Sequence, residues 1–214
     1  MASMADIKAL RKRTGAGILD CKNALVASST IEEAIDWLRT KGITKAAKKS
    51  TRAATEGLVH AYIHGNGRIG VMIEVNCETD FAAMNTQFQG LVHDLSMHIA
   101  AASPEYVSIE DIPADLAEKE KVVQTARVIE EGKPAHIAER IVVGRINKWY
   151  KDICLLEQPY VKDDSKTVKQ VMHNAVATIG ENIQIRRFTR YVLGEGLAKK
   201  EDNFAEEVAK VTGR

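Results

Sequence analysis

The sequence predicts an α+β protein built on a small antiparallel sheet, and three observations lead to this prediction. Two β-rich runs, Leu58–His64 and Ile69–Asn76, flank the turn signal Gly65-Asn66-Gly67-Arg68. A third β-rich run, Ile183–Leu193, lies near the end of the chain. The segments around these runs carry apolar residues spaced by three and four, which is typical of amphipathic helices.

Residues 1–55 are expected to form a head of three short helices and a basic connector. The first helix contains Ile7 and Leu10 and ends at the turn Thr14-Gly15-Ala16-Gly17. The second helix has an apolar stripe spaced by three and four, with two further apolar residues beside it: Ile18, Cys21 and Leu25 in the stripe, and Leu19 and Val26 beside it.

The third helix is predicted to begin at a capping box formed by Thr30 and Glu33. Its apolar residues recur at i, i+3, i+4 and i+7 from Ile31 to Leu38, and the pattern predicts an end before Gly42. The segment Lys45–Arg52 is basic and rich in Ala but has no apolar periodicity, so it is predicted to connect the head to the body.

The body, residues 56–193, is expected to form the α+β core. One face of its second strand carries Ile69, Val71, Ile73 and Val75 and should be buried. A two-residue Asn66-Gly67 turn would pair His64 with Ile69 on this face, whereas a loop of odd length would turn His64 to the other face. We expect the loop of odd length, which turns His64 away from the buried face.

A long amphipathic helix is predicted after Thr79-Asp80-Phe81, with an end before Pro104. Residues 114–151 are predicted to form a helical hairpin, because Ala114–Glu131 and Ala135–Lys151 are joined by Gly132-Lys133-Pro134. A further apolar stripe predicts a helix that stops at Gly180: Val168, Val171, Met172, Ala175, Val176 and Ile179. Residues 194–214 are expected to form a C-terminal helical module after Gly194-Glu195-Gly196.

The composition is that of an ordinary soluble protein: 214 residues, 45% apolar, 28% charged and a net charge of +1. No stretch approaches the roughly 18 apolar residues of a membrane span, and Met1–Ala16 lacks the apolar core of a secretory signal. We therefore expect a cytoplasmic protein that does not bind membranes. Three widely spaced cysteines without a CxxC pair favour free, partly buried thiols: Cys21, Cys77 and Cys154.

The charge is unevenly distributed along the chain. Residues 1–55 contain 11 Lys and Arg against 5 Asp and Glu, a net +6, and the remainder carries 19 against 24, a net −5. A basic head is compatible with a nucleic acid and equally with an acidic protein partner. Both classes of partner stay open on this observation.

Few motifs point to catalysis or to a bound group. The string Gly65–Gly70 matches GxGxxG, but a β-rich run follows it where a dinucleotide site needs a helix N-terminus, so it indicates a hairpin turn. His60 and His64 share a strand face without a third ligand. We expect no catalytic residue, cofactor or metal, and an enzyme would need converging titratable groups that no spacing supports.

The polar segment Asn76–Phe81 at the end of a buried strand has two interpretations. Thr79 or Asp80 could cap the next helical turn while Phe81 enters the core. Alternatively, the segment is an exposed functional loop. Arg11, Ile18 and Leu19 likewise could be ordinary surface and core residues of helices.

Several long motifs together resemble bacterial elongation factor Ts, and the resemblance runs nearly from end to end. They are Leu10-Arg11 with Arg13–Lys22, Val75–Phe81, Gly132-Lys133-Pro134, Ile179–Ile183 with Arg186-Arg187-Phe188, Gly194-Glu195-Gly196 and Asp202–Val208. The resemblance implies a non-enzymatic guanine nucleotide exchange factor that binds GDP-bound and nucleotide-free elongation factor Tu and promotes GDP release during translation. It also implies a head similar to a ubiquitin-associated domain.

The resemblance assigns partner contacts to particular residues. Arg11, Ile18 and Leu19 match family residues that dock on the GTP-binding domain of elongation factor Tu. Thr79, Asp80 and Phe81 match a segment that enters beside the partner's magnesium and phosphate site, where the aromatic ring is wedged between two helices. His64 matches a histidine that contacts the same region, and Phe204 matches the tail helix that grips the partner.

The chain departs from longer family members in having room for one copy of the core subdomain. It is similar to short members in which dimerisation supplies the second copy. Some of these link their dimer through a cysteine in the Arg-Arg-Phe strand, but this chain has Thr189 there, so a non-covalent homodimer is the hypothesis. The alternative function is that of a binding module in which the basic head binds RNA or the ribosome. For an exchange factor, we expect no direct binding to nucleic acid.

Overall fold

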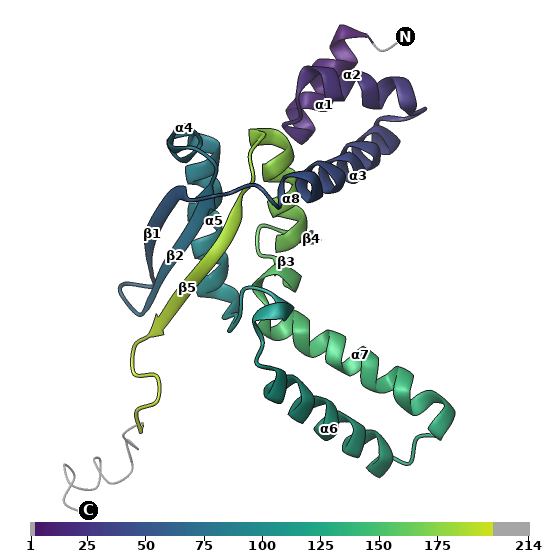
Figure 1. The fold of residues 1–214 in the computed structure, drawn as a ribbon, viewed down its shortest axis with the longest axis vertical. Helices are drawn as coiled ribbons and strands as arrows, with labels where there is room; N and C mark the ends of the chain where they lie inside the picture. Colours follow the sequence, from purple (N-terminus) through teal and green to yellow (C-terminus); the bar gives the residue numbers. More distant parts are fainter. Residues whose placement is uncertain (1–2, 199–214) are drawn as a thin grey trace, which may run out of the picture.

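The computed structural model describes residues 3–198, and it confirms the predicted α+β architecture (Figure 1). Three strands form the central antiparallel sheet in the order β1 (Glu56–His64), β2 (Ile69–Cys77) and β5 (Gln184–Val192). A second antiparallel pair, β3 (Pro159–Tyr160) and β4 (Asp163–Thr167), was not predicted from the sequence. The third strand of the central sheet therefore comes from a distant part of the chain.

The head consists of α1 (Met4–Thr14), α2 (Ile18–Ala27) and α3 (Ile31–Lys49), as the apolar spacing predicts. Thr30 caps α3 as predicted, since its hydroxyl accepts a hydrogen bond from the Glu33 amide. The reciprocal half of the predicted capping box is wrong, because the Glu33 carboxylate accepts from the Ser29 amide instead of the Thr30 amide. The three helices pack on a small apolar core of their own: Ile7, Leu10, Cys21, Ala24 and Ala34.

The predicted end of the third helix before Gly42 is wrong, because α3 continues to Lys49 and includes most of the predicted connector. Gly42 lies where α3 crosses α8 (Val168–Ile179), and a Cβ atom built on it would be 3.5 Å from the Cβ atom of Ala177. The glycine thus permits a close helix crossing. Lys49 also donates a hydrogen bond to the carbonyl of Gly180, which ties the end of α3 to the end of α8.

One face of the central sheet is covered by α5 (Thr86–Ala102), and α8 packs beside it (Figure 1). Val71, Ile73 and Val75 of β2 are buried on this face, as predicted, and Ile69 is half-buried. The opposite face remains exposed among the described residues and carries large apolar side chains: Val59, Ile63, Met72 and Tyr191.

The register of the β1–β2 hairpin differs from our expectation. Residues 65–68 form a four-residue turn, and His64 pairs directly with Ile69. The predicted loop of odd length is wrong. Residues 65–67 all have positive φ values, and this backbone conformation closes a loop of even length without shifting the register. His64 therefore lies on the same face of β1 as Tyr62, at the end of the strand.

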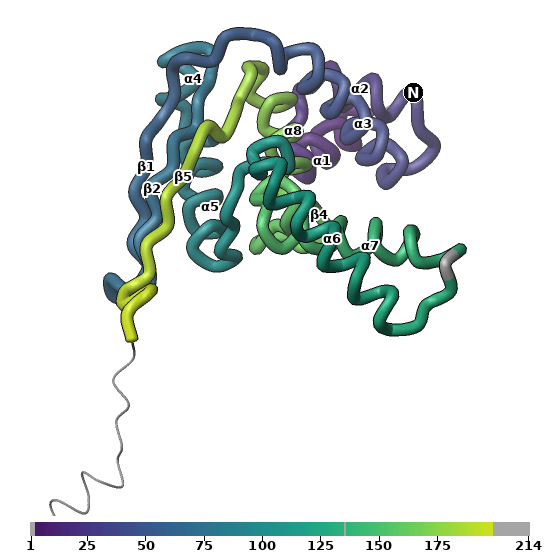
Figure 2. Tube along the Cα trace, turned by 60° about the horizontal axis from the view of Figure 1, so that its bottom comes forward, coloured from purple at the N-terminus to yellow at the C-terminus, as the bar shows by residue number. Residues whose placement is uncertain are grey.

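The predicted helical hairpin is confirmed and protrudes from the body as α6 (Ala114–Glu130) and α7 (Ala135–Ile153) (Figure 2). Short 3-10 turns, η1 (Ile109–Asp111) and η2 (Leu155–Glu157), lie at its base. Backbone hydrogen bonds join the two chain segments there: Tyr106 N to Ile153 O at 3.1 Å, Leu155 N to Tyr106 O at 2.9 Å, and Leu156 N to Val107 O at 3.0 Å. We call these two paired segments, residues 105–107 and 153–156, the neck.

The helix expected after Gly194-Glu195-Gly196, together with Phe204, falls on residues 199–214 and lies outside the described residues. Among residues 3–198, no helix combines the length and apolarity that crossing a membrane requires.

Candidate partner-binding site

Strand β2 leads directly into an exposed turn of helix, α4 (Asp80–Ala83), and we call residues 79–84 the tip. The Thr79 hydroxyl accepts a hydrogen bond from the Ala82 amide at 3.3 Å, so the predicted capping role is confirmed. Of the two interpretations of this segment, the one in which Phe81 enters the core is wrong. Its side chain is 80% exposed, and the buried position is taken by Ala82, which is 7% exposed.

The tip presents a second apolar side chain that the sequence analysis did not identify. Met84 is 70% exposed one turn after Phe81. The Asp80 carboxylate is also exposed and accepts a hydrogen bond from the Phe81 amide at 2.9 Å. The tip thus offers apolar surface beside a carboxylate, and its exposed position suits contact with another macromolecule.

The backbone of the tip is held from beneath. The Glu181 carboxylate accepts hydrogen bonds from the Glu78 and Thr79 amides at 3.1 and 3.0 Å, and from the Thr79 hydroxyl at 2.7 Å. The Cys77 thiol donates to the Thr79 carbonyl at 3.1 Å, and burial raises the pKa of that thiol. These contacts fix the backbone from which Phe81 projects.

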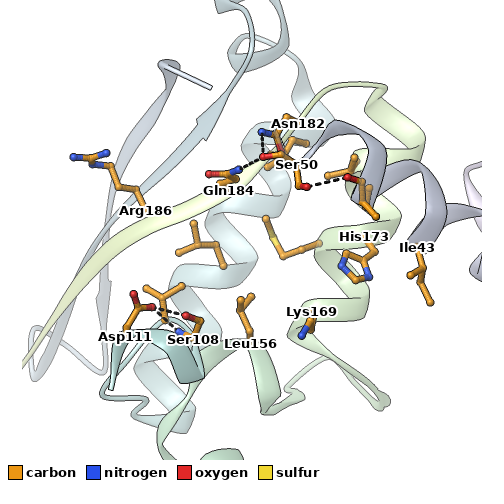
Figure 3. A pocket seen from close by; sticks show the side chains of 17 residues that line it. Ile43, Ser50, Ser108, Asp111, Leu156, Lys169, His173, Asn182, Gln184 and Arg186 are labelled. Atoms are coloured by element: carbon orange, nitrogen blue, oxygen red, sulfur yellow. Dashed lines mark hydrogen bonds between the residues drawn. The ribbon is translucent and has the colours of Figure 1, made fainter. Parts of the chain in front are cut away.

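A second layer of contacts links the tip to the end of the head. The Asn182 amide donates to the Glu78 carboxylate at 2.6 Å and lowers the pKa of that carboxyl, with a further contribution from the Arg52 guanidinium. The Asn182 side chain donates to the Arg52 carbonyl at 2.8 Å and to the Ser50 carbonyl at 3.4 Å. Figure 3 shows Asn182, Ser50 and Gln184 close together on this side of the molecule.

A hollow of about 540 Å³ lies next to this contact, between α3, α8 and the outer edge of β5 (Figure 3). The residues that line it include Met172, Ile185, Lys169 and His173. The Nδ1 atom of His173 is buried without a hydrogen-bond partner, and burial lowers the pKa of this imidazole. In the part of the chain that the structure describes, no three His, Cys, Asp or Glu side chains gather as metal ligands would.

The head residues singled out in the sequence all lie on the surface. Ile18 and Leu19, at the start of α2, are 55% and 69% exposed, and Arg11 is exposed near the end of α1. Of the two positions left open in the sequence, surface or core, Ile18 lies on the surface, and Cys21 and Ala24 of α2 are buried in the core of the head. Two adjacent large apolar side chains are therefore available on the surface of the head.

His64 lies far from the tip within one chain. It is exposed beside the hairpin turn, where its Nδ1 atom is 2.9 Å from the Tyr62 hydroxyl. The tip follows the opposite end of the same hairpin, since Cys77 pairs with Glu56. At ~3.3 Å per residue, the nine residues of β1 separate these two ends by about 26 Å. The structure thus brings Thr79, Asp80 and Phe81 together but does not bring His64 to them.

The chain was compared with known proteins. The family model described as Elongation factor TS matches residues 2–195. The protein named Elongation factor Ts from Citrifermentans bemidjiense is 58% identical over 211 residues, which cover 98% of both chains. The protein of the same name from Geobacter metallireducens is 57% identical over 98% of this chain and 97% of its own, and that from Acetivibrio thermocellus is 55% identical over 98% of both.

These matches cover the head, the tip, the sheet and the helical hairpin in one alignment. The chain belongs to the elongation factor Ts family and is a translation elongation factor.

Proposed function

We propose that this protein is a guanine nucleotide exchange factor for elongation factor Tu and acts without enzymatic chemistry of its own. The observation that carries the proposal is Phe81, a large apolar side chain that is 80% exposed on a tip whose backbone is fixed. Phe81 is exposed together with Met84 on the same tip, and such a group of neighbouring apolar side chains favours a role in binding.

Burial of the Phe81 ring supplies free energy for the exchange. Moving a phenylalanine side chain from water into an apolar site is worth roughly 1.5–3 kcal/mol. In the proposed mechanism, this gain is available only when two helices of the GTP-binding domain have moved apart. The factor then binds the nucleotide-free partner better than the GDP-bound one, and linkage requires GDP to weaken the factor's binding by the same ratio.

Asp80 is proposed to act on the magnesium ion that bridges GDP to the partner. Magnesium demands near-ideal octahedral oxygen coordination, so a small displacement of its ligands weakens its binding. The exposed Asp80 carboxylate lies one residue from the inserted ring and would disturb the water and protein ligands of the ion. This role requires a charged oxygen and no proton transfer.

The head supplies affinity rather than the disturbance itself. Ile18 and Leu19 form an exposed apolar pair, and with Arg11 they are proposed to dock on the GTP-binding domain. The tail helix with Phe204 is proposed to add a further contact, although it lies outside the described residues.

The position of His64 leads us to propose a non-covalent homodimer. About 26 Å of strand separates His64 from the tip, and we propose that the His64 side chain that contacts the partner region near Phe81 comes from a second copy. The uncovered sheet face offers an apolar surface for that copy. Thr189 lies on this face directly opposite Met72 in the sheet, at the position of the cysteine in some short members.

The dimer is tested with Met72→Glu, which places a charge in the centre of the uncovered face. Val122→Glu is a matched control, because Val122 is exposed to a similar degree on the helical hairpin. Sedimentation should show a dimer for the native chain and for Val122→Glu, and a monomer for Met72→Glu. A native chain that is monomeric at high concentration would remove the dimer from the proposal.

The alternative function, RNA or ribosome binding by the basic head, receives less support. Lys41 and Lys45 both lie against the Asp20 carboxylate, at 3.4 and 2.5 Å, and Lys49 binds the end of α8. These cations are engaged within the protein. The alternative predicts nucleic-acid binding that weakens steeply with added salt, whereas the exchange factor predicts a stable complex with a nucleotide-free GTPase.

The decisive experiment measures the release of a fluorescent GDP analogue from elongation factor Tu. The native chain should accelerate release strongly, Phe81→Ala should accelerate it much less, and Ile129→Ala should match the native chain. Ile129 is a suitable control because it is 68% exposed on the helical hairpin. Acceleration that survives Phe81→Ala would keep the function and discard the wedge. No acceleration by the native chain would refute the exchange-factor proposal.

A further inference from the structure

We propose that Glu181 is a positioning residue for nucleotide exchange, because it holds the tip in the geometry from which Phe81 and Asp80 act. Together with Asn182, it also fixes the tip relative to the head. This inference rests on the exchange function proposed above and names the residues that keep its site ordered.

Glu181 accepts hydrogen bonds from backbone amides at the start of the tip, which lie beyond the end of the sheet. The β1–β2 ladder ends at the pair Glu56 and Cys77, so the amides of Glu78 and Thr79 lie beyond it. Both donate to one oxygen of Glu181, while the Thr79 hydroxyl donates to the other oxygen. A charged acceptor that receives three hydrogen bonds orients the backbone more firmly than neutral acceptors would.

The same Thr79 hydroxyl continues the arrangement into the tip. It donates to Glu181 and accepts from the Ala82 amide, so the carboxylate sets the orientation of the capping group. Ala82 is buried beneath the tip, and Phe81 is directed outward by the turn that starts at Thr79. A change at position 181 is therefore transmitted to Phe81 through one hydroxyl and two amides.

The neighbouring Asn182 joins the same turn to the head. Its side chain is buried and donates to the carbonyls of Ser50 and Arg52, just after α3 (Figure 3). Its backbone amide donates to Glu78, and the carbonyl of Gly180 accepts from Lys49. Residues 180–182 thus contact both the end of the head and the start of the tip. These contacts hold the start of the tip beside the end of α3.

Order in the tip should affect the exchange step more than the affinity. A mobile tip would have to be ordered during GDP release, and the conformational entropy lost there would oppose insertion of the ring. The contacts of the head would not change, so the factor would still bind. We expect a lower maximal rate of GDP release at an unchanged half-saturating concentration of factor.

The test compares Glu181→Ala, Glu181→Gln and the control Glu130→Ala, whose carboxylate is exposed on the helical hairpin. Two measurements are made: GDP release across factor concentrations, and hydrogen exchange of the Glu78 and Thr79 amides. Glu181→Ala should lower the maximal rate roughly tenfold or more, with the half-saturating concentration within about twofold of native, and should accelerate exchange of both amides.

Glu181→Gln should recover most of the activity, to within about threefold of native, because its side-chain oxygen can still accept from both amides. Should Glu181→Ala not fold, Glu181→Asp replaces it, since it keeps the charge but shortens the reach by one methylene. A native maximal rate in Glu181→Ala, or a loss confined to the half-saturating concentration, would overturn the inference. Equal losses in the Gln and Ala variants would also overturn it.

The failure of this inference differs from the failure of the proposed function. If the native chain does not accelerate GDP release, the exchange function is refuted, while the amide exchange still reports whether Glu181 orders the tip. If the native chain accelerates release and both amides of Glu181→Ala stay protected, only the positioning role is refuted.

Discussion

Substitution of Gly57 by alanine should destabilise the protein severely, and the structure gives the reason. Gly57 has a φ of +142° and pairs with Asn76 near the end of the β1–β2 ladder. A Cβ atom built on it would lie 2.1 Å from the Val75 carbonyl oxygen and 2.7 Å from the Asn76 Cα atom. Both neighbours are backbone atoms of β2, so no side-chain rotation relieves the overlap.

The expected loss combines two costs. Forcing extra atoms into a packed region costs about 1–3 kcal/mol, and a sparsely populated backbone conformation costs about 1–3 kcal/mol more. The total of about 2–6 kcal/mol is a large part of the ~5–15 kcal/mol that stabilises a typical domain. With a urea dependence of ~2 kcal/mol per molar, the unfolding midpoint should fall by about 1–3 M.

Urea denaturation of Gly57→Ala beside Gly67→Ala separates the two costs. Gly67 also has a positive φ, +86°, but a Cβ atom there meets no atom within 4 Å. Gly67→Ala should therefore lose only the backbone cost of about 1–2 kcal/mol of unfolding free energy. If the two variants lost the same amount, or if Gly57→Ala stayed within ~1 kcal/mol of native, the steric reasoning would be refuted.

Three further predictions concern the head contact, the pH dependence and the thiols. Gly42→Ala should keep native stability within about 1 kcal/mol, because its Cβ atom would be 3.5 Å from Ala177, whereas Gly42→Leu should lower the melting temperature by several degrees through overpacking between α3 and α8. His98 is buried, its Nδ1 atom accepts a hydrogen bond from the Val161 amide, and burial lowers its pKa. The folded state therefore favours the neutral imidazole. The contribution of His98 to the free energy of unfolding is complete above about pH 6.5 and declines as the pH falls. The urea midpoint should drop between pH 7 and pH 5.5, and less steeply in His98→Gln. All three cysteines are buried, and burial raises the pKa of Cys154 to about 11. A thiol reagent should therefore label the cysteines slowly in the folded protein and quickly in urea. A thiol that reacts fast in the native state would contradict this prediction.

Local patterns in the sequence predicted the elements that depend on local interactions. The Thr30 cap, the apolar stripe of α8 and the Gly-Lys-Pro turn of the helical hairpin each act within a few residues. The buried face of β2 followed from its alternation of apolar residues. The structure confirmed these elements.

The differences arise where tertiary contacts decide. The sequence predicted that the third helix ends before Gly42. In the structure, packing of α3 against Ala177 of α8 outweighs the low helix propensity of a single glycine. Ile18 has the same spacing as its neighbour Cys21 in the apolar stripe, yet Cys21 and Ala24 are buried in the head and Ile18 is exposed. The support of the tip was not predictable either, because Glu181 and Thr79 are 102 residues apart.

The neck has a consequence for how this protein tolerates changes in length. Its two segments are joined by backbone hydrogen bonds on both sides of Tyr106, with Ile153 and Leu155 as the partners. The chain thus enters and leaves the helical hairpin through adjacent points, and the entropy lost in bringing these points together grows only slowly with the number of residues between them. Whole helical turns could be added to or removed from α6 and α7 without altering the spacing of α5 and α8. The hairpin is in this sense an interchangeable appendage, whose reach can evolve independently of the sheet and the tip.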